Sequence, residues 1–114
     1  MIKGIGTDIV DIRRIAGLID EFGEKFLNKI FNEEERTTKT GEGCCAHYAK
    51  RYAAKEAISK ALGTGIGETN FKHIKILKKP SGQPYAEIEG FKGTIHLSLS
   101  DDYPYAVAYA IIEE

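Results

Sequence analysis

An alanine-rich run that ends in glycine is the feature of this sequence that most constrains its fold. Residues 51–62 include four alanines, which favour helix, and Gly63 follows at a position where a helix is expected to stop. Residues three and four apart share a helical face, so Glu56, Ser59 and Lys60 are predicted to project together. A carboxylate, a hydroxyl and an ammonium group on one face suit a metal ion that holds a phosphate group.

The composition limits the chain to one small domain and argues against several classes of protein. The 114 residues, 42% of them apolar, suffice for a single domain spanning 1–114. The core of such a domain is small, so oligomerisation would be an unsurprising source of further buried surface. The formal net charge of -1 argues against a nucleic-acid-binding protein, because such proteins usually carry a clear cationic surplus. No segment has the length of a membrane span and the N-terminus lacks a signal-peptide pattern, so we expect no membrane association.

The two cysteines favour a reducing compartment. Cys44 and Cys45 are adjacent and poorly placed to form a disulfide with each other, so we expect a cytoplasmic protein. Cys44 and His47 have the spacing of half a zinc site, but no second pair follows to complete four ligands. The sequence therefore argues against zinc at this position.

The first thirty residues are predicted to form one strand and two helices. Branched apolar residues favour a strand over 2–10, in which Gly4 and Gly6 indicate a close approach to the strand backbone. Apolar residues then recur with helical spacing over 12–30. Gly23 interrupts this pattern, so two short helices are expected rather than one.

Two further helical segments are expected between residues 32 and 62. Asn32 and Glu35 resemble a capping box, which indicates a helix that runs toward the loop at 39–43. The long helix is then expected over about 44–62.

The C-terminal half is predicted to be a series of strands linked by turns. Alternating residues and a Pro-Ser-Gly turn favour a hairpin of 71–77 and 85–89. Residues 94–100 alternate between an apolar face and a polar face, and 105–112 are apolar on both faces, as in a central strand. Helices placed between a first strand and several later strands indicate an α+β domain with a mostly antiparallel sheet, one long helix and shorter helices.

Several polar residues are candidates for chemistry, and each has an ordinary alternative. Asp8 and Glu56 are plausible magnesium ligands, since this ion needs only one or two protein carboxylates beside water and phosphate oxygens. The alternatives are a strand-end position for Asp8 and a salt bridge from Glu56 to Lys60 on a solvated face. Ser59 is a candidate donor to phosphate, although a helical serine more often bonds back to a carbonyl, and Lys55 is expected to lie in solvent.

Two other regions of the sequence are candidates for ligand contacts. Backbone N–H groups of the glycine-rich segment 63–67 are candidates for contacts with a phosphate. The alternative is that the segment only ends the helix and forms a loop. His96 and Ser98 share the polar face of their predicted strand, although a lone histidine is more often structural.

The first two helices combine cations with large apolar residues, a mixture that suits an acidic helical protein partner. Arg14 and Lys25 supply the charge, and Leu18, Phe22 and Phe26 supply the apolar contacts. The alternative is that these apolar residues belong to the core.

Two stretches of the chain resemble the signatures of a known family. Residues 4–12, GIGTDIVDI, and residues 51–67, RYAAKEAISKALGTGIG, are similar to those of the holo-acyl-carrier-protein synthases, the small bacterial members of the 4'-phosphopantetheinyl transferase superfamily. The resemblance covers nearly the whole chain and implies the 4'-phosphopantetheinyl transferase fold. It implies a magnesium-dependent transferase of fatty acid biosynthesis, which moves 4'-phosphopantetheine from coenzyme A to a serine of apo-acyl carrier protein and releases adenosine 3',5'-bisphosphate.

The resemblance also implies roles for individual residues. It makes Asp8 and Glu56 the magnesium ligands and Lys60 the cation that contacts phosphate and assists proton transfer. The residues expected to line the coenzyme A site are Ser59, Gly63, Gly65, His96 and Ser98. The residues expected to bind the acyl carrier protein are Arg14, Leu18, Phe22, Lys25 and Phe26.

The resemblance further implies an assembly and reveals one departure from the family. Members are homotrimers with sites between subunits, so Asp8 of one chain is expected to face Glu56 of its neighbour. The C-terminal signature commonly reads His-x-Ser-x-Ser-His, and here Asp101 stands where the second histidine would be. A carboxylate cannot donate a hydrogen bond as a histidine does, so the coenzyme A side of the site is expected to differ.

Two rival functions come from other classes of protein. One is a non-catalytic binding module whose basic helix recognises an acidic protein. The other is a nucleotide-binding regulatory domain that uses residues 63–67 without turnover. Neither explains why separate acidic positions, Asp8 and Glu56, lie within both family-like stretches.

Overall fold

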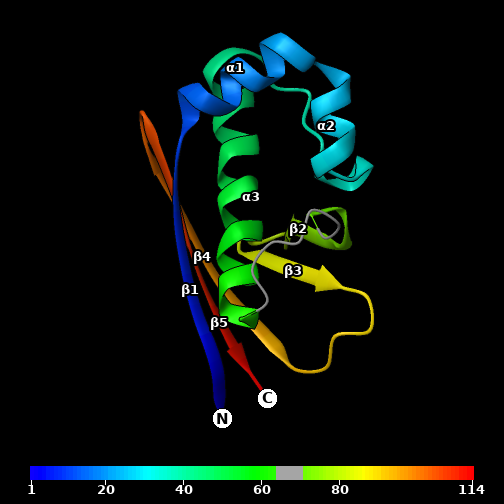
Figure 1. Ribbon diagram of the computed structural model, residues 1–114, viewed down its shortest axis with the longest axis vertical. Helices are drawn as coiled ribbons and strands as arrows, with labels where there is room; N and C mark the ends of the chain where they lie inside the picture. The colour runs from blue at the N-terminus through cyan, green and yellow to red at the C-terminus, as the bar shows by residue number, and fades with distance from the viewer. Residues whose placement is uncertain (64–70) are drawn as a thin grey trace.

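One long helix packed on a three-stranded antiparallel sheet forms the frame of the molecule (Figure 1). The computed structural model describes residues 1–63 and 71–114. The sheet consists of β1 (Ile2–Asp11), β5 (Tyr105–Glu113) and β4 (Thr94–Asp102), in the order β1-β5-β4. Both pairs of neighbours are antiparallel. β5 is therefore the central strand, as its apolar pattern predicted.

Helix α3 (Gly41–Leu62) packs against one face of this sheet. It begins at Gly41, earlier than predicted, and ends as predicted at Gly63, whose φ of 76° is left-handed. Small side chains on both sides allow the helix to lie close to the strands. The fully buried alanines are Ala49, Ala53, Ala54 and Ala57 of α3 and Ala106, Ala108 and Ala110 of β5.

Two glycines of β1 set the distance between this strand and α3. A Cβ atom added to Gly4 would lie 1.8 Å from the carbonyl oxygen of Ala61, and one added to Gly6 would lie 1.9 Å from that of Ala57. The predicted close approach is confirmed, and the approaching element is the backbone of α3. Alternate residues of a strand share a face, so Asp8 also points toward α3.

Two short helices and a single 3₁₀ turn connect β1 to α3. Helix α1 (Ile12–Phe22) and helix α2 (Glu24–Ile30) are separated at Gly23, which has a φ of 54°, so the predicted break is confirmed. The capping box of Asn32 is also present. The helix predicted to follow it is wrong, because the segment forms only the 3₁₀ turn η1 (Glu33–Glu35) before the chain extends again.

A separate two-stranded sheet lies beside α3 (Figure 1). It is the predicted hairpin, formed by antiparallel β2 (Ile74–Lys78) and β3 (Pro84–Ile88). The first residues of the expected strand instead form the 3₁₀ turn η2 (Phe71–His73). The α+β class is confirmed. Within residues 1–63 and 71–114, no helix is both long and apolar enough to cross a membrane.

Candidate active site

Asp8, Glu56 and Lys60 lie together where β1 packs against α3. The Lys60 Nζ is 3.3 Å from Oδ1 of Asp8 and donates to the Thr7 carbonyl oxygen at 3.0 Å. Glu56 precedes Lys60 by one helical turn, and the charge of Asp8 raises the pKa of Glu56. The structure thus brings together the three residues predicted to carry the chemistry.

The electrostatics of Glu56 suit a divalent cation. Burial raises the pKa of Glu56, and the nearby Asp8 carboxylate raises this pKa further. Hydrogen bonding to Tyr52 and the positive charges of Lys60 and Arg14 act in the opposite direction. A divalent cation between the carboxylates would relieve their repulsion, so Asp8 and Glu56 fit magnesium.

Both carboxylates belong to one chain. This corrects the expectation that Asp8 of one subunit faces Glu56 of its neighbour. The cause is the Gly4 and Gly6 contact, which holds the β1 backbone against the same helix that carries Glu56. Across the described parts of the chain, no group of three or more His, Cys, Asp or Glu side chains is arranged to hold a metal ion. Asp8 and Glu56 therefore supply two carboxylates, and their role as magnesium ligands stays a prediction.

Ser59 does not project with Glu56 and Lys60 as predicted. Its side chain is 4% exposed, and its Oγ donates to the Lys55 carbonyl oxygen at 3.0 Å. This is the ordinary alternative for a helical serine. Ser59 still lines a cavity, so its role in the coenzyme A site stays a prediction.

A cavity of about 1120 Å³ opens beside the C-terminal end of α3. Ser59 and Leu62 form its helical wall, next to Gly63, which ends α3. Residues of η2, β2 and β3 form the other walls. The charged residues lining it are Lys72, Lys75, Glu87 and Glu89. Gly65, also predicted to line the ligand site, lies outside the described residues.

His96 and Ser98 are not brought to Asp8 and Glu56 within one chain. They lie opposite Ile111 and Tyr109 of β5, on the face of the sheet that points away from α3. The Nε2 atom of His96 is 3.0 Å from Oε1 of Glu113, and both side chains are about half exposed. Within one chain these two residues and Asp8 lie on opposite faces of the sheet, and their role in the coenzyme A site stays a prediction.

The face of the sheet that carries His96 is unusually apolar for an exposed surface. Large side chains from β1 and β5 stand on it without a partner among the described residues of this chain. Those most exposed are Ile5 at 66%, Ile9 at 63%, Tyr109 at 55% and Tyr105 at 47%. Exposed apolar surface of this kind typically marks an interface.

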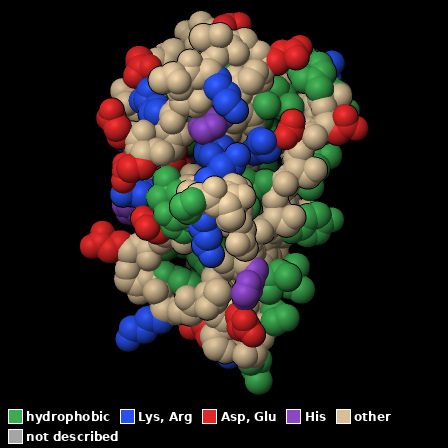
Figure 2. Space-filling model, turned by 180° about the vertical axis from the view of Figure 1, so that it is seen from behind, with side chains coloured by type: hydrophobic (Ala, Val, Ile, Leu, Met, Phe, Trp, Pro, Cys, Tyr) green, Lys and Arg blue, Asp and Glu red, His purple; other side chains and the backbone are tan. Residues whose placement is uncertain are grey.

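A group of cations near the middle of α3 was not predicted. Arg51 is 5% exposed, and its Nε finds no hydrogen-bond partner among the described residues. Burial, together with Arg51 and other nearby cations, lowers the pKa of His47 to about 4. Lys78 and Lys50 add two more charges to this surface, where Figure 2 shows blue side chains gathered beside a histidine. The residues are scattered along the chain, so only their packing reveals the group.

Asp101, the residue that departs from the family signature, faces this cationic group. Its Oδ1 atom is 3.0 Å from Nζ of Lys50. The carboxylate therefore neutralises part of a surface that is otherwise positive.

The residues predicted to bind a protein partner divide into exposed and buried ones. Arg14 and Lys25 are exposed, Phe22 is 47% exposed and Leu18 is half-buried. Phe26 is buried in the core, edge to face with Phe31, which corrects its prediction as a partner contact. Arg14 lies over the ring of Tyr52 and donates to its hydroxyl at 3.2 Å. One end of the predicted docking surface thus lies next to Glu56.

Comparison with known proteins identifies the family. Residues 4–110 match the model of the 4'-phosphopantetheinyl transferase superfamily. The chain is 44% identical to a holo-[acyl-carrier-protein] synthase of Caulobacter vibrioides over 128 residues, covering 99% of this chain and 96% of that protein. It is 41% identical to the synthase of Agrobacterium fabrum with the same coverage.

Solved structures agree with the sequence matches. A holo-(acyl-carrier-protein) synthase from Bacillus anthracis, in complex with CoA (3',5'-ADP), superposes with a TM-score of 0.90 at 37% identity, covering 100% of this chain and 98% of that one. The Helicobacter pylori enzyme in complex with coenzyme A has a TM-score of 0.85 at 33% identity, covering 96% and 99%. The chain belongs to the 4'-phosphopantetheinyl transferase superfamily.

Proposed function

We propose that this chain acts as a holo-[acyl-carrier-protein] synthase. It transfers 4'-phosphopantetheine from coenzyme A to a serine of apo-acyl carrier protein and releases adenosine 3',5'-bisphosphate, in support of fatty acid and lipid biosynthesis. The observation that carries the proposal is the meeting of Asp8, Glu56 and Lys60 in one site. The activity named for the relatives supports it.

The transfer reaction requires stabilisation of negative charge more than it requires a covalent intermediate with the protein. The serine oxygen of the carrier forms a bond to the phosphorus that bears pantetheine, while the bond from this phosphorus to adenosine 3',5'-bisphosphate breaks. Magnesium, when bound by Asp8 and Glu56, supplies positive charge to the pyrophosphate. Lys60, whose side chain is 55% exposed, would contact a phosphate oxygen through its ammonium group and, when neutral, would assist transfer of the serine proton.

The cavity beside Ser59 is the proposed site for part of coenzyme A. Its volume of about 1120 Å³ suits a ligand of this size. Lys72 and Lys75 attract the phosphates, whereas Glu87 and Glu89 disfavour them near β3. Any phosphate group of coenzyme A in this cavity, apart from the pyrophosphate proposed to lie at Asp8 and Glu56, is therefore expected on the lysine side.

A homotrimer is proposed on the basis of the exposed apolar sheet face. Ile5, Ile9 and Tyr109 would be buried there between subunits. This arrangement would also carry His96 and Ser98 of one subunit toward the site of another. Light scattering tests it: we expect a trimer, and a Tyr109→Glu variant that is monomeric. A wild-type chain that is monomeric at micromolar concentration would contradict the proposal.

The exposed face of α1 is the proposed docking site for the acyl carrier protein. We expect Arg14→Glu to raise the KM for the carrier about tenfold, because it replaces attraction to an acidic partner with repulsion. The KM for coenzyme A should change less, as measured by steady-state kinetics. Lys79→Glu makes the same charge change at an exposed position in the turn between β2 and β3 and serves as the control. Equal effects on both substrates would contradict this docking assignment.

A cytoplasmic location is proposed for this reaction. Cys44 and Cys45 are both free thiols, which agrees with a reducing compartment.

The proposal is tested most simply by following adenosine 3',5'-bisphosphate. Coenzyme A, magnesium and this chain should release it only when apo-acyl carrier protein is present. A carrier whose acceptor serine is replaced by alanine is the control. Release at the same rate without a carrier would indicate hydrolysis and contradict a transferase.

A further inference from the structure

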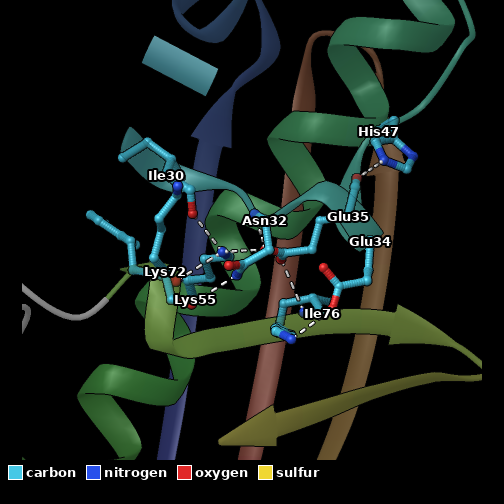
Figure 3. A network of polar contacts seen from close by, with 10 residues as sticks. Ile30, Asn32, Glu34, Glu35, His47, Lys55, Lys72 and Ile76 are labelled. Carbon is cyan, nitrogen blue, oxygen red and sulfur yellow. Dashed lines mark hydrogen bonds and ion pairs between the residues drawn. The ribbon is translucent and has the colours of Figure 1, made fainter. Parts of the chain in front are cut away.

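Lys55, expected to lie in solvent, is instead buried, with 0% of its surface exposed. Its Nζ donates to the carbonyl oxygen of Ile30 at 2.7 Å, to Oε1 of Glu35 at 2.8 Å and to the carbonyl oxygen of Phe71 at 2.8 Å. All three donors of the ammonium group are therefore used, and the contacts come from different segments of the fold (Figure 3).

Glu35, the partner of Lys55, is also fully enclosed by donors. Its Oε1 accepts from the backbone N–H and the side-chain amide of Asn32, at 2.9 and 3.1 Å. Its Oε2 accepts from the backbone N–H of Ile76 at 3.0 Å. A buried ion pair contributes little net stability compared with apolar packing, but its satisfied hydrogen bonds fix the geometry of the groups around it.

The segment fixed by this network is one wall of the cavity. Lys55 holds the carbonyl of Phe71, the side-chain amide of Asn32 donates to the Lys72 carbonyl at 2.7 Å, and Glu35 holds the N–H of Ile76. Figure 3 shows these contacts converging from α3, η1 and β2. Residues 72–75 line the cavity between these anchor points.

The same network reaches Glu56 through two aromatic rings. The ring of Phe71 stacks on that of Tyr52, with centroids 5.2 Å apart and an angle of 29° between planes. Tyr52 precedes Glu56 by one helical turn, and its side chain lowers the pKa of that carboxyl group. A shift of Phe71 would therefore move the group that orients the Glu56 carboxylate.

We infer that the buried Lys55–Glu35 pair is a positioning device for the transfer reaction. It holds residues 71–76 as the cavity wall and, through Phe71 and Tyr52, orients the carboxylate of Glu56. Neither residue touches the reacting groups, so both act through others. The inference rests on the proposed function for its kinetic consequences, while its structural part stands on the contacts alone.

The surroundings of Lys55 shift its pKa. Burial lowers this pKa to about 8, the charge of Glu35 on η1 raises it, and Lys72 of η2 and Arg51 of α3 lower it.

The test is the double variant Glu35→Gln/Lys55→Met, which removes both charges and leaves no buried charge unpaired. We expect a folded protein whose kcat is about tenfold to a hundredfold lower. The KM for the carrier should stay within about twofold of the original, because α1 is untouched. Amide hydrogen exchange of residues 71–76, measured without substrate, should become faster. A kcat and an exchange rate like those of the original chain would overturn the inference.

A second variant tests the inference even if the double variant does not fold. Phe71→Leu removes the stacking on Tyr52 and leaves the ion pair in place. We expect kcat to fall again, while the KM for the carrier stays unchanged. An unchanged kcat would overturn the inference that Phe71 and Tyr52 orient Glu56. The control is Glu24→Gln/Arg36→Met, which removes a partly exposed ion pair between α2 and the end of η1, together with the hydrogen bond from Arg36 to Asn28, and should change neither readout. A wild-type chain without transfer activity would refute the proposed function, while faster exchange in the double variant would still support the structural part.

Discussion

The Glu56→Gln variant is expected to lose transferase activity while it keeps its fold. The amide has the shape of the carboxylate but no charge, so it is a poor magnesium ligand, and less magnesium would be held where it could offset the charge on the pyrophosphate. We expect kcat to fall by about a hundredfold to a thousandfold, the usual effect of removing one preorganised electrostatic contact. Steady-state kinetics with saturating magnesium measures it.

The control for this variant is Glu42→Gln, which makes the same change at an exposed position in the first turn of α3. Its kcat should match that of the original chain. Near-normal activity of Glu56→Gln would remove Glu56 from the metal site and leave Asp8 without its partner.

The stability of Glu56→Gln provides an independent check on the electrostatics. Because the folded pKa of Glu56 is raised, its ionised form is less favourable in the folded chain than in the unfolded one. This penalty is present above the folded pKa and disappears as the pH falls below the unfolded pKa. Without metal, the variant should therefore melt at an equal or higher temperature at neutral pH, and the difference should shrink in acid. A clearly lower melting temperature would mean that Glu56 stabilises the fold.

The Gly6→Ala variant is expected to have the largest effect on stability. Its Cβ would lie 1.9 Å from the Ala57 carbonyl oxygen, and both groups belong to backbones that cannot turn aside as a flexible side chain can. Either β1 or α3 must shift, and we expect the free energy of unfolding to fall by about 3 kcal/mol or more. Because the shift would also separate Asp8 from Glu56, any folded variant should have reduced activity.

The matched control is Gly17→Ala on α1, where an added Cβ meets nothing within 4 Å. This substitution removes a glycine from a helix, so it should leave the free energy of unfolding unchanged or raise it by about 0.5 to 1 kcal/mol. Urea denaturation compares the two variants. Equal midpoints for Gly6→Ala and the original chain would show that the strand and helix are not held together by this contact.

The parts of the fold that sequence reasoning predicted are those with a local cause. Gly23 and Gly63 break helices because of their own backbone conformation, and Asn32 caps the residues that follow it. The glycines of β1 indicated a close neighbour because a residue without a Cβ atom leaves room for one. They did not indicate which element the neighbour is, because that depends on a contact between distant segments.

Sequence reasoning predicted which residues meet at the site, but it predicted less well how the surrounding residues are arranged. Lys55 and Lys60 look alike on an alanine-rich helix, yet Lys55 is buried because the Glu35 carboxylate and the carbonyl oxygens of Ile30 and Phe71 meet at its ammonium group. The joint placement of Asp8 and Glu56 in one chain likewise depends on the packing of β1 against α3. No spacing along the chain contains this information, which is why the expectation of a pair shared between subunits was wrong.

The intact mass of the acyl carrier protein tests the central claim most directly. Apo-carrier incubated with this chain, coenzyme A and magnesium is expected to gain the mass of one phosphopantetheine group at its acceptor serine. The gain should be absent when a chelator removes magnesium and should return when magnesium is restored. A carrier whose mass stays unchanged in magnesium, with several apo-carriers and a folded chain, would contradict the account.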